Sequence, residues 1–411
     1  AALCFVLHQD HTMRFALFAA FICLAVATSA VRQVQNLDNQ KRIPGEFLVV
    51  LHKPAYEATR VTYANAVADK ITSISQISIV QKFTNLEAPI FLVKTSEESV
   101  MNQLFNIDEV DIIESNVVEN MIQQCASQSS GSRLWGLSRV SSRDLPNFSG
   151  ASFSYGSGDG SGVRVYVLDT GIRLSHVDFG GRAVFGSNQV GGSNDDNNGH
   201  GTHCAGTVMG TEYGVAKGAT AVAVKVLPDS GSGPVSNIIA GVNWAVGDIA
   251  SRPQRGVLSM SLGGGANAAM DSAVNSAIAA GIPVVTASGN NAGDGCNNSP
   301  GRAPNVINVG NTDNTDTLAS TSNYGSCVSV LAPGTGILSA SHTSNTGSRT
   351  LSGTSMACPH VAGLVARYIS QNPNASPAQA KSFVINNATP NRINLRGLNA
   401  TPNLLMYSRC N

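Results

Sequence analysis

Residues 163–168 read VRVYVL, and Asp169 follows them directly. This nearly continuous apolar run, rich in valine, is typical of a strand that is buried on both faces of a sheet. Helix-length segments, such as 236–249 and 266–280, separate several further runs of this kind. Buried strands that alternate with helices predict an α/β domain with a mostly parallel sheet between two helical layers. The further runs are residues 221–227, 257–262, 282–287 and 306–309.

The composition excludes several classes of protein. The chain has 411 residues, of which 42% are hydrophobic and only 13% are charged, so it is not an intrinsically disordered protein. Its 26 basic and 26 acidic residues balance, which excludes nucleic-acid binding through bulk positive charge. Only one apolar run approaches the length of a membrane-spanning helix, so a multi-span membrane protein is also excluded.

The first thirty residues are typical of a targeting segment rather than of a fold. Met13 and Arg14 precede an apolar core at 15–27, and the small residues Thr28, Ser29 and Ala30 follow it. This order predicts residues upstream of the true start and a secretory signal peptide within 1–30, and therefore a secreted, extracellular protein. A membrane anchor is the alternative, which the shortness of the apolar core disfavours.

Residues 31–126 differ from the rest in both pattern and charge. Strands expected at 46–51, 90–94 and 110–113, with helices at 56–74 and 100–104, predict a small α+β unit over about 45–120. This segment has a net charge of −4 and residues 127–411 have +4, which fits two parts that dock or mere compositional scatter. The polar residues 123–132 lack an apolar period and predict an exposed linker.

Three segments carry residues suited to nucleophilic catalysis. Asp169 follows the strand at 163–168, His200 lies in NGHGTHCAG at a predicted helix start, and Ser355 lies in SGTSMACPHVAG at the head of another helix. Alone, the aspartate could be structural and the serine an N-cap. Together they supply a nucleophile, a base and a group that orients the base. His203 could pair with His200 on a metal, but a packed structural histidine explains it better.

The chain resembles the proteinase K branch of the subtilases, a family of serine proteases. The order Asp, His, Ser is that of subtilisin, and the motifs VLDTGI, GHGTHCAG, SLGGG, ASGNN, SNYGS, APGTGI and GTSMACPHVAG carry the resemblance from residue 135 to the last helices. It implies a subtilisin-like three-layer α/β domain, preceded by a small α+β ferredoxin-like propeptide. It also implies a serine-type endopeptidase with Asp169, His200 and Ser355 as catalytic triad.

The same resemblance implies an oxyanion hole and a peptide-binding cleft. Asn290 and the backbone N–H of Ser355 would stabilise the oxyanion. Two edge segments would hold an extended peptide as an added strand, which gives broad specificity. Small uncharged residues in the S1 wall favour large hydrophobic or aromatic P1 side chains. The binding residues implied are Gly231, Ser232, Gly233, Ser261, Leu262 and Gly263 at the edges, and Ala287, Ser288 and Gly289 in the S1 wall.

The front unit resembles an inhibitory propeptide that assists folding and then blocks the site. Cleavage within about residues 123–130 would release a monomeric enzyme that acts on proteins and peptides, with no nucleic-acid partner and no membrane contact once the signal is removed. A catalytically silent relative that only binds peptides or inhibitors is the alternative. A metal-dependent hydrolase lacks a convincing ligand set.

The cysteines fit an oxidising destination but not a disulfide scaffold. Cys296 and Cys327 close a stretch rich in glycine and asparagine, and they match a pairing seen in some relatives. Cys204 and Cys358 are interpreted as small buried packing residues. A cysteine protease would need Cys358 at the helix head, where Ser355 already stands.

No cofactor is expected for the chemistry, and the presence of a metal is left open. Some family members hold a structural calcium through carbonyls near Pro304 and Val306 and through an aspartate. Ser329 stands at the position of that aspartate, which disfavours calcium because the ion prefers carboxylate oxygens. Asp195 and Asp196 could serve another ion, but a solvated acidic loop before His200 is the better interpretation.

Overall fold

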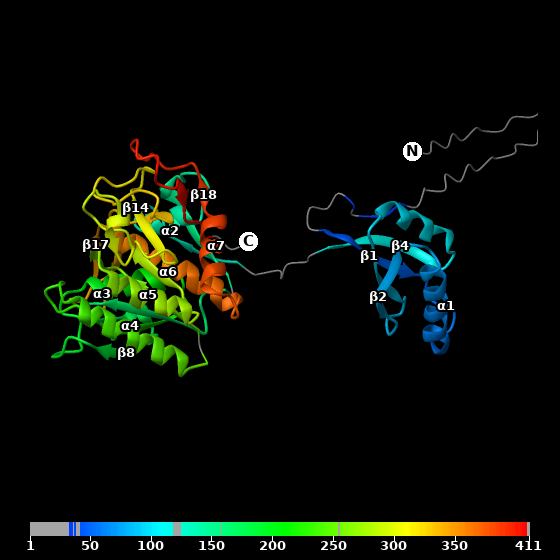
Figure 1. Cartoon of the computed structure of the whole chain (residues 1–411), viewed down its shortest axis with the longest axis horizontal. Helices are drawn as coiled ribbons and strands as arrows, with labels where there is room; N and C mark the ends of the chain where they lie inside the picture. Colours follow the sequence, from blue (N-terminus) through cyan, green and yellow to red (C-terminus); the bar gives the residue numbers. More distant parts are fainter. Residues whose placement is uncertain are drawn as a thin grey trace, which may run out of the picture. The chain divides into compact units, whose positions relative to one another are not determined.

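The computed structural model describes residues 33–35, 37, 42–117, 125–156, 158–253 and 255–408. It divides into two compact units, Ala1–Met121 and Ile122–Asn411, whose elements are labelled in Figure 1. The predicted signal peptide at 1–30 lies outside the described residues. Within them, no helix has both the length and the hydropathy needed to span a membrane.

The first unit is a four-stranded antiparallel sheet in the order β2-β3-β1-β4. Alternate residues of β1 and the inner face of α1 build its core, which contains Phe47, Val49, Val67 and Ile71. Its succession of strands and helices is that of a ferredoxin-like unit. The helix expected at 100–104 is a longer 3₁₀ helix. The elements are β1 (Arg42–Leu51), η1 (Glu57–Thr59), α1 (Arg60–Thr72), β2 (Ile77–Phe83), β3 (Ile90–Thr95), η2 (Glu98–Asn106) and β4 (Val110–Val117).

The second unit is built on a nine-stranded sheet in the order β18-β19-β15-β14-β12-β10-β7-β9-β8. All neighbouring strands are parallel except β18 and β19. The five predicted buried runs all form strands of this sheet. The strands are β7 (Val163–Asp169), β8 (Ala183–Asn188), β9 (Thr220–Lys225), β10 (Arg255–Met260), β12 (Val284–Ala287), β14 (Ile307–Thr312), β15 (Val330–Pro333), β18 (Thr389–Pro390) and β19 (Leu404–Leu405).

Strand β7 divides the interior of this unit into two cores, because successive side chains of a strand point to opposite faces. Val165 and Val167 pack with α3 (His200–Met209) and α6 (Thr354–Gln371). Tyr166 and Leu168 pack with α4 (Val235–Ala250) and α5 (Ala268–Ala279). The apolar character of β7 therefore reflects burial on both faces, and the second unit is the three-layer α/β domain that the resemblance implied.

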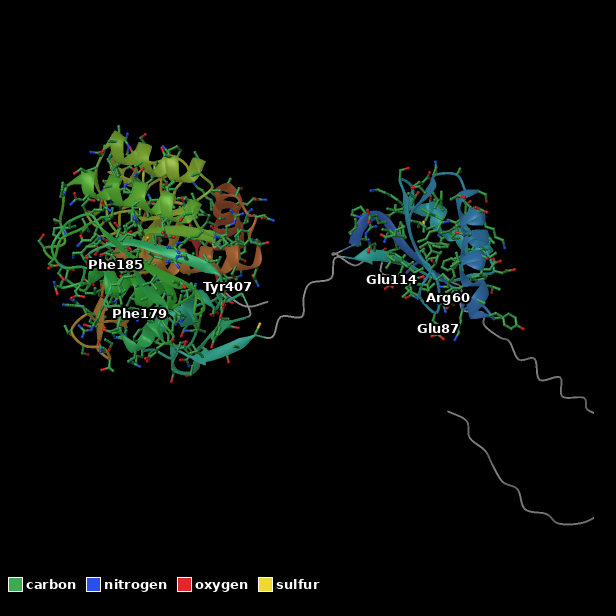
Figure 2. All side chains as sticks on the ribbon, turned by 90° about the horizontal axis from the view of Figure 1, so that it is seen from below. Arg60, Glu87, Glu114, Phe179, Phe185 and Tyr407 are labelled. Atoms are coloured by element: carbon green, nitrogen blue, oxygen red, sulfur yellow. A yellow bond between two sulfur atoms is a disulfide. The ribbon has the colours of Figure 1, made fainter. Side chains whose placement is uncertain are left out.

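Several short elements complete the second unit. Phe179 ends η4 (Val177–Phe179) in the interior, whereas Phe185 on the edge strand β8 is 44% exposed; both are labelled in Figure 2. The remaining elements are β5 (Ala126–Ser129), α2 (Trp135–Val140), η3 (Phe148–Gly150), β6 (Ser152–Tyr155), β11 (Gly264–Gly265), η5 (Gly295–Asn297), β13 (Asn298–Ser299), β16 (Ile337–Ala340), β17 (Ser348–Leu351) and α7 (Pro377–Asn387).

Residues 125–132, the described part of the predicted linker, are not a simple linker. Strand β5 pairs with β6 of the second unit, and Ser130 is buried. Ala126, Ser127 and Ser129 are exposed as predicted, but the prediction missed their strand. The short polar run ASQS has no apolar period, and backbone pairing does not require one. The boundary that the sequence placed after Ala126 therefore falls inside a strand of the second unit.

A buried ion pair fixes α2 to the loop after β14. The Arg139 side chain is fully buried, and its Nε and Nη2 donate to the two carboxylate oxygens of Asp316 at 2.6 and 2.9 Å. Nη1 donates to the Ser142 carbonyl oxygen at 2.6 Å. Two parallel hydrogen bonds of this kind give both strength and a defined geometry.

We predict that Arg139→Met lowers the free energy of unfolding by about 3–5 kcal/mol, because it leaves the Asp316 carboxylate buried without a partner. Urea unfolding of the full chain measures the effect. Arg392→Met is the matched control, since it breaks an exposed ion pair with Asp144 and should cost less than about 1 kcal/mol. Equal losses in the two variants would contradict this interpretation.

Candidate active site

Asp169 and His200 meet where a strand ends and a helix begins. Asp169 is the last residue of β7, and His200 is the first residue of α3. The Asp169 carboxylate is completely buried and accepts from His200 Nδ1, at 2.8 Å to Oδ1 and 2.9 Å to Oδ2. Burial is the largest single influence on the pKa of His200 and lowers it, but the charge and hydrogen bond of Asp169, together with the interactions of Cys204, outweigh burial and hold the pKa well above the usual 6.5.

The buried carboxylate of Asp196 holds these two elements together. It accepts hydrogen bonds from Thr170 Oγ1 at 2.8 Å and from Gly199 N at 2.8 Å. Its second oxygen accepts from Thr202 N at 2.9 Å and from Thr202 Oγ1 at 2.6 Å. The interpretation of Asp196 as part of a solvated acidic loop was wrong, because the residue is 4% exposed. Of the two aspartates, Asp195 is the one that is exposed to solvent.

Ser355 is the second residue of α6, and its carbonyl oxygen has unusual partners. Pro359 lies inside the helix and has no N–H to donate to the residue four positions earlier, which is Ser355. The Ser355 carbonyl oxygen instead accepts from Ser261 Oγ at 2.9 Å and from Cys204 Sγ at 3.4 Å.

The Ser355 hydroxyl donates to the Ser261 carbonyl oxygen at 3.1 Å. Among the hydrogen bonds of the described residues, none joins Ser355 Oγ to His200 Nε2. Catalytic hydrogen bonds are often long or misaligned in the absence of substrate. The structure thus brings Ser355 to the same cavity as His200, with its hydroxyl turned toward the neighbouring strand end.

Asn290 is oriented by Thr354, the residue before Ser355. The side-chain oxygen of Asn290 accepts from Thr354 N at 2.8 Å and from Thr354 Oγ1 at 3.1 Å. Gly289 N donates to the same Thr354 hydroxyl at 3.2 Å. Because the amide oxygen is held in this way, the NH₂ group of Asn290 is the part of the side chain that remains to donate to a ligand in the cavity.

A cavity of about 570 Å³ contains His200, Ser355 and Asn290 in its wall. Eight of the nine predicted substrate-binding residues line it too. Ser288 is the exception: it is completely buried, and its hydroxyl donates to the Asn323 carbonyl oxygen at 3.5 Å. Ser288 follows the last residue of β12 and its side chain alternates with its neighbours, so it points away from the cavity.

The cavity wall also contains residues that sequence reasoning did not identify. None of the described residues that line it is Asp, Glu, Lys or Arg. Its apolar part comes from segments whose pattern indicated only a hydrophobic core, so no separate sequence signal marked them. The additional lining residues are Thr170, Asn198, Leu227, Val235, Ile238, Gly264, Met270, Asn291, Asn298 and Thr354.

The two free thiols near the site are not activated. Burial raises the pKa of Cys204, and it raises the pKa of Cys358 to about 12, so both are protonated at neutral pH. A nucleophilic cysteine needs the opposite shift. His203 is also buried, which lowers its pKa to about 4, and its Nε2 bonds the Ile337 carbonyl oxygen. These contacts indicate packing roles for all three residues.

Metal-type side chains gather at one place in the part of the chain that the structure describes. Ligand atoms of Asp169, His200 and Cys204 lie within 4.8 Å of one another. His200 Nδ1 is already shared by both oxygens of Asp169, and the Cys204 thiol is protonated, so this set does not have the form of a metal centre. Elsewhere, Cys296 and Cys327 form a disulfide with an S–S distance of 2.02 Å.

Comparison with known proteins places this geometry in a family. The sequence model that represents the subtilase family matches residues 160–402 of this chain. An alkaline serine exoprotease A of Vibrio alginolyticus is 39% identical over 89% of this chain and 68% of its own length. A cuticle-degrading serine protease of Arthrobotrys oligospora is 38% identical over 92% of this chain and 94% of its own length.

A solved structure agrees with these relatives. The crystal structure of a cold adapted subtilisin-like serine proteinase matches with a TM-score of 0.64 and 42% identity, over 68% of this chain and all of the other. Family model, relatives and fold point to the same chemistry. The chain therefore belongs to the subtilase family and is a serine-type endopeptidase.

Proposed function

We propose that the chain is a secreted, broadly specific endopeptidase that matures by cutting itself, with Ser355 as nucleophile, His200 as base and Asp169 as its orienting carboxylate. The observation that carries the proposal is the contact of His200 Nδ1 with buried Asp169 at the edge of a cavity that also contains Ser355. Nδ1 is committed to the carboxylate, so Nε2 is the nitrogen that can exchange a proton with a hydroxyl.

The reaction begins when the Ser355 hydroxyl turns from the Ser261 carbonyl oxygen toward His200 Nε2, a rotation about χ1. Oγ then bonds to the substrate carbonyl carbon while its proton passes to Nε2, and the carbonyl π electrons move to the oxygen. When the intermediate collapses, the C–N bond breaks and His200 returns the proton to the leaving amine. Water, deprotonated by His200, then hydrolyses the acyl ester in the same way.

The negative oxygen of the intermediate would be bound by Asn290 and by the backbone N–H of Ser355. Thr354 holds the Asn290 amide oxygen, so the amide N–H is oriented before substrate arrives. Donors that are already oriented need no rearrangement when the transition state forms. In subtilisin, one such donor contributes roughly 3–4 kcal/mol to transition-state stabilisation.

Substrate would bind as an extended strand between two segments, Gly231–Ser232–Gly233 and Ser261–Leu262–Gly263, all of which line the cavity. Backbone pairing of this kind gives affinity without a sequence requirement. Ala287 and Gly289 leave room for the P1 side chain, and no Asp, Glu, Lys or Arg among the described lining residues offers a partner for a charged P1 residue.

The first unit would act as folding chaperone and inhibitor until it is removed. A parallel sheet closes many distant contacts and folds slowly, so a docked partner can assist it. Strand β5 pairs with β6 in the second unit, which favours cleavage before Ala126. A similar protein of Thermus sp. (strain Rt41A) is named an extracellular serine proteinase, which supports secretion. We expect the mature enzyme to be a monomer.

Replacement of the nucleophile tests the chemistry and the self-processing together. We predict that Ser355→Ala lowers kcat for casein by roughly 10⁶-fold, as loss of the nucleophile does in subtilisin, and that the chain accumulates uncut. The natural enzyme should lose its activity in a serine-directed sulfonyl fluoride but not in a chelator. Activity that survives the sulfonyl fluoride would point away from Ser355. A Ser355→Ala chain that is cleaved in isolation would exclude self-maturation.

The raised pKa of His200 predicts a shifted pH profile. The base must be neutral, so kcat/KM should fall as the pH drops through the pKa of His200, with a midpoint above 6.5. Asp169→Asn should move that midpoint down and lower kcat by about 10⁴-fold. Asp178→Asn is the control, because it removes a buried carboxylate that does not line the cavity. This variant should leave the midpoint of the pH profile unchanged. An unmoved midpoint in Asp169→Asn contradicts the assignment.

The uncharged cavity wall predicts the cleavage preference. In a digest of a mixed peptide library, we expect cuts after Phe, Tyr, Leu or Met to exceed cuts after Lys, Arg, Asp or Glu by about 10-fold or more, because an apolar side chain gains about 1.5–3 kcal/mol on burial and a charge loses hydration. Mass spectrometry of the products gives the preference directly. A majority of cuts after charged residues would refute this assignment of the S1 wall.

A further inference from the structure

The loop before β14 is held by a lysine from a distant helix. Lys381 lies on α7, and its Nζ donates to the Pro304 carbonyl oxygen at 2.9 Å. Among the described residues, no carboxylate forms an ion pair with Lys381. Burial lowers the pKa of this ammonium group. Burial of a cation without a counter-charge costs free energy unless oxygen dipoles compensate the charge. The hydrogen bond to the Pro304 carbonyl oxygen supplies part of this compensation.

The oxygens that line the hollow around this ammonium belong to neutral groups, and the Arg302 side chain, which also lines it, is paired with Asp271. A hollow of about 340 Å³ is lined by Pro304, Val306, Ser329 and Lys381, among others. Ser329 Oγ donates to the Val306 carbonyl oxygen at 3.5 Å and accepts from Asn308 N at 3.1 Å. Each of the two loop carbonyls therefore faces a donor that belongs to this chain, the lysine for Pro304 and the serine for Val306.

These residues do not fit calcium, which the resemblance raised for this position. Calcium takes six to eight oxygen ligands and usually includes carboxylates among them. Here the side-chain oxygen is a hydroxyl whose hydrogen already points at one carbonyl, and the Lys381 ammonium bonds the other. A fixed positive charge in the hollow would also repel a divalent cation.

We propose that Lys381 is the resident cation of the Pro304–Val306 loop and takes the place that a calcium ion would hold. The ammonium is tethered by its own helix, so a chelator cannot remove it, and it ties α7 to the loop that leads into β14. This inference goes beyond the proposed function and does not depend on the catalytic triad.

The test compares Tm in EDTA with Tm in millimolar calcium for four forms of the mature enzyme, blocked with a sulfonyl fluoride against self-digestion. We expect Lys381→Met to lower Tm by roughly 3–6 °C in both media, through the lost charged hydrogen bond. Ser329→Asp alone should gain an ion pair with Lys381 and no response to calcium. Only Lys381→Met combined with Ser329→Asp should gain a calcium-dependent rise, of roughly 5–10 °C when calcium is about 100-fold above its Kd.

Lys217→Met combined with Ser329→Asp is the matched control. Lys217 also donates to backbone carbonyls, those of Thr211 and Glu212, but it lies outside this hollow, so the control should behave like Ser329→Asp alone. The proposal is overturned if the calcium shift is the same in all forms, or if Lys381→Met leaves Tm in EDTA unchanged. It is also overturned if Ser329→Asp alone shows a calcium-dependent rise in Tm of roughly 5–10 °C, a measurement that does not require any Lys381 variant to fold.

Discussion

The catalytic geometry depends on one buried carboxylate, that of Asp196. It bonds Thr170 at the end of β7 and both the N–H and the hydroxyl of Thr202 in the first turn of α3. Asp169 and His200 belong to the same two elements. The hydrogen bonds of Asp196 therefore set the distance between them. A carboxylate that accepts several hydrogen bonds without solvent permits little movement, which keeps the imidazole in one orientation while it exchanges a proton.

A second constraint originates in the first turn of α6, which contacts both Ser261 and Asn290. Pro359 has no N–H to donate to the Ser355 carbonyl oxygen within the helix. That oxygen accepts a hydrogen bond from Ser261 instead, a residue of one proposed substrate edge. Thr354 on the same first turn orients Asn290. The proposed nucleophile, oxyanion donor and substrate edge are therefore connected by hydrogen bonds at the start of α6.

Sequence patterns predicted the sheet well because both faces of its strands are buried, and burial leaves a strong apolar signal. The sequence also located Asp169 and His200 near a strand end and a helix start, where parallel strands gather chemistry. It failed at Ser288, whose orientation depends on strand alternation, and at Asp196, because a charged residue in a polar run gives no sign of burial. The paired strand β5 was missed for the related reason that backbone hydrogen bonds leave no mark on side-chain pattern.

The chain contains few charged residues, and buried cations among them hold loops in place through hydrogen bonds. Lys225 is almost fully buried, and its Nζ donates to the Thr170 carbonyl oxygen at 2.5 Å and to Asp229 at 2.8 Å. Asn198, whose side chain also bonds His200 N, donates to the Asp229 carbonyl oxygen. The segment that precedes residues 231–233 is thus anchored to the residue that follows Asp169 and to the loop that precedes His200. A long stem that reaches carbonyl oxygens can tie together segments that are distant in sequence. No local pattern reveals these carbonyl contacts, because the accepting oxygen is a backbone atom that every residue possesses.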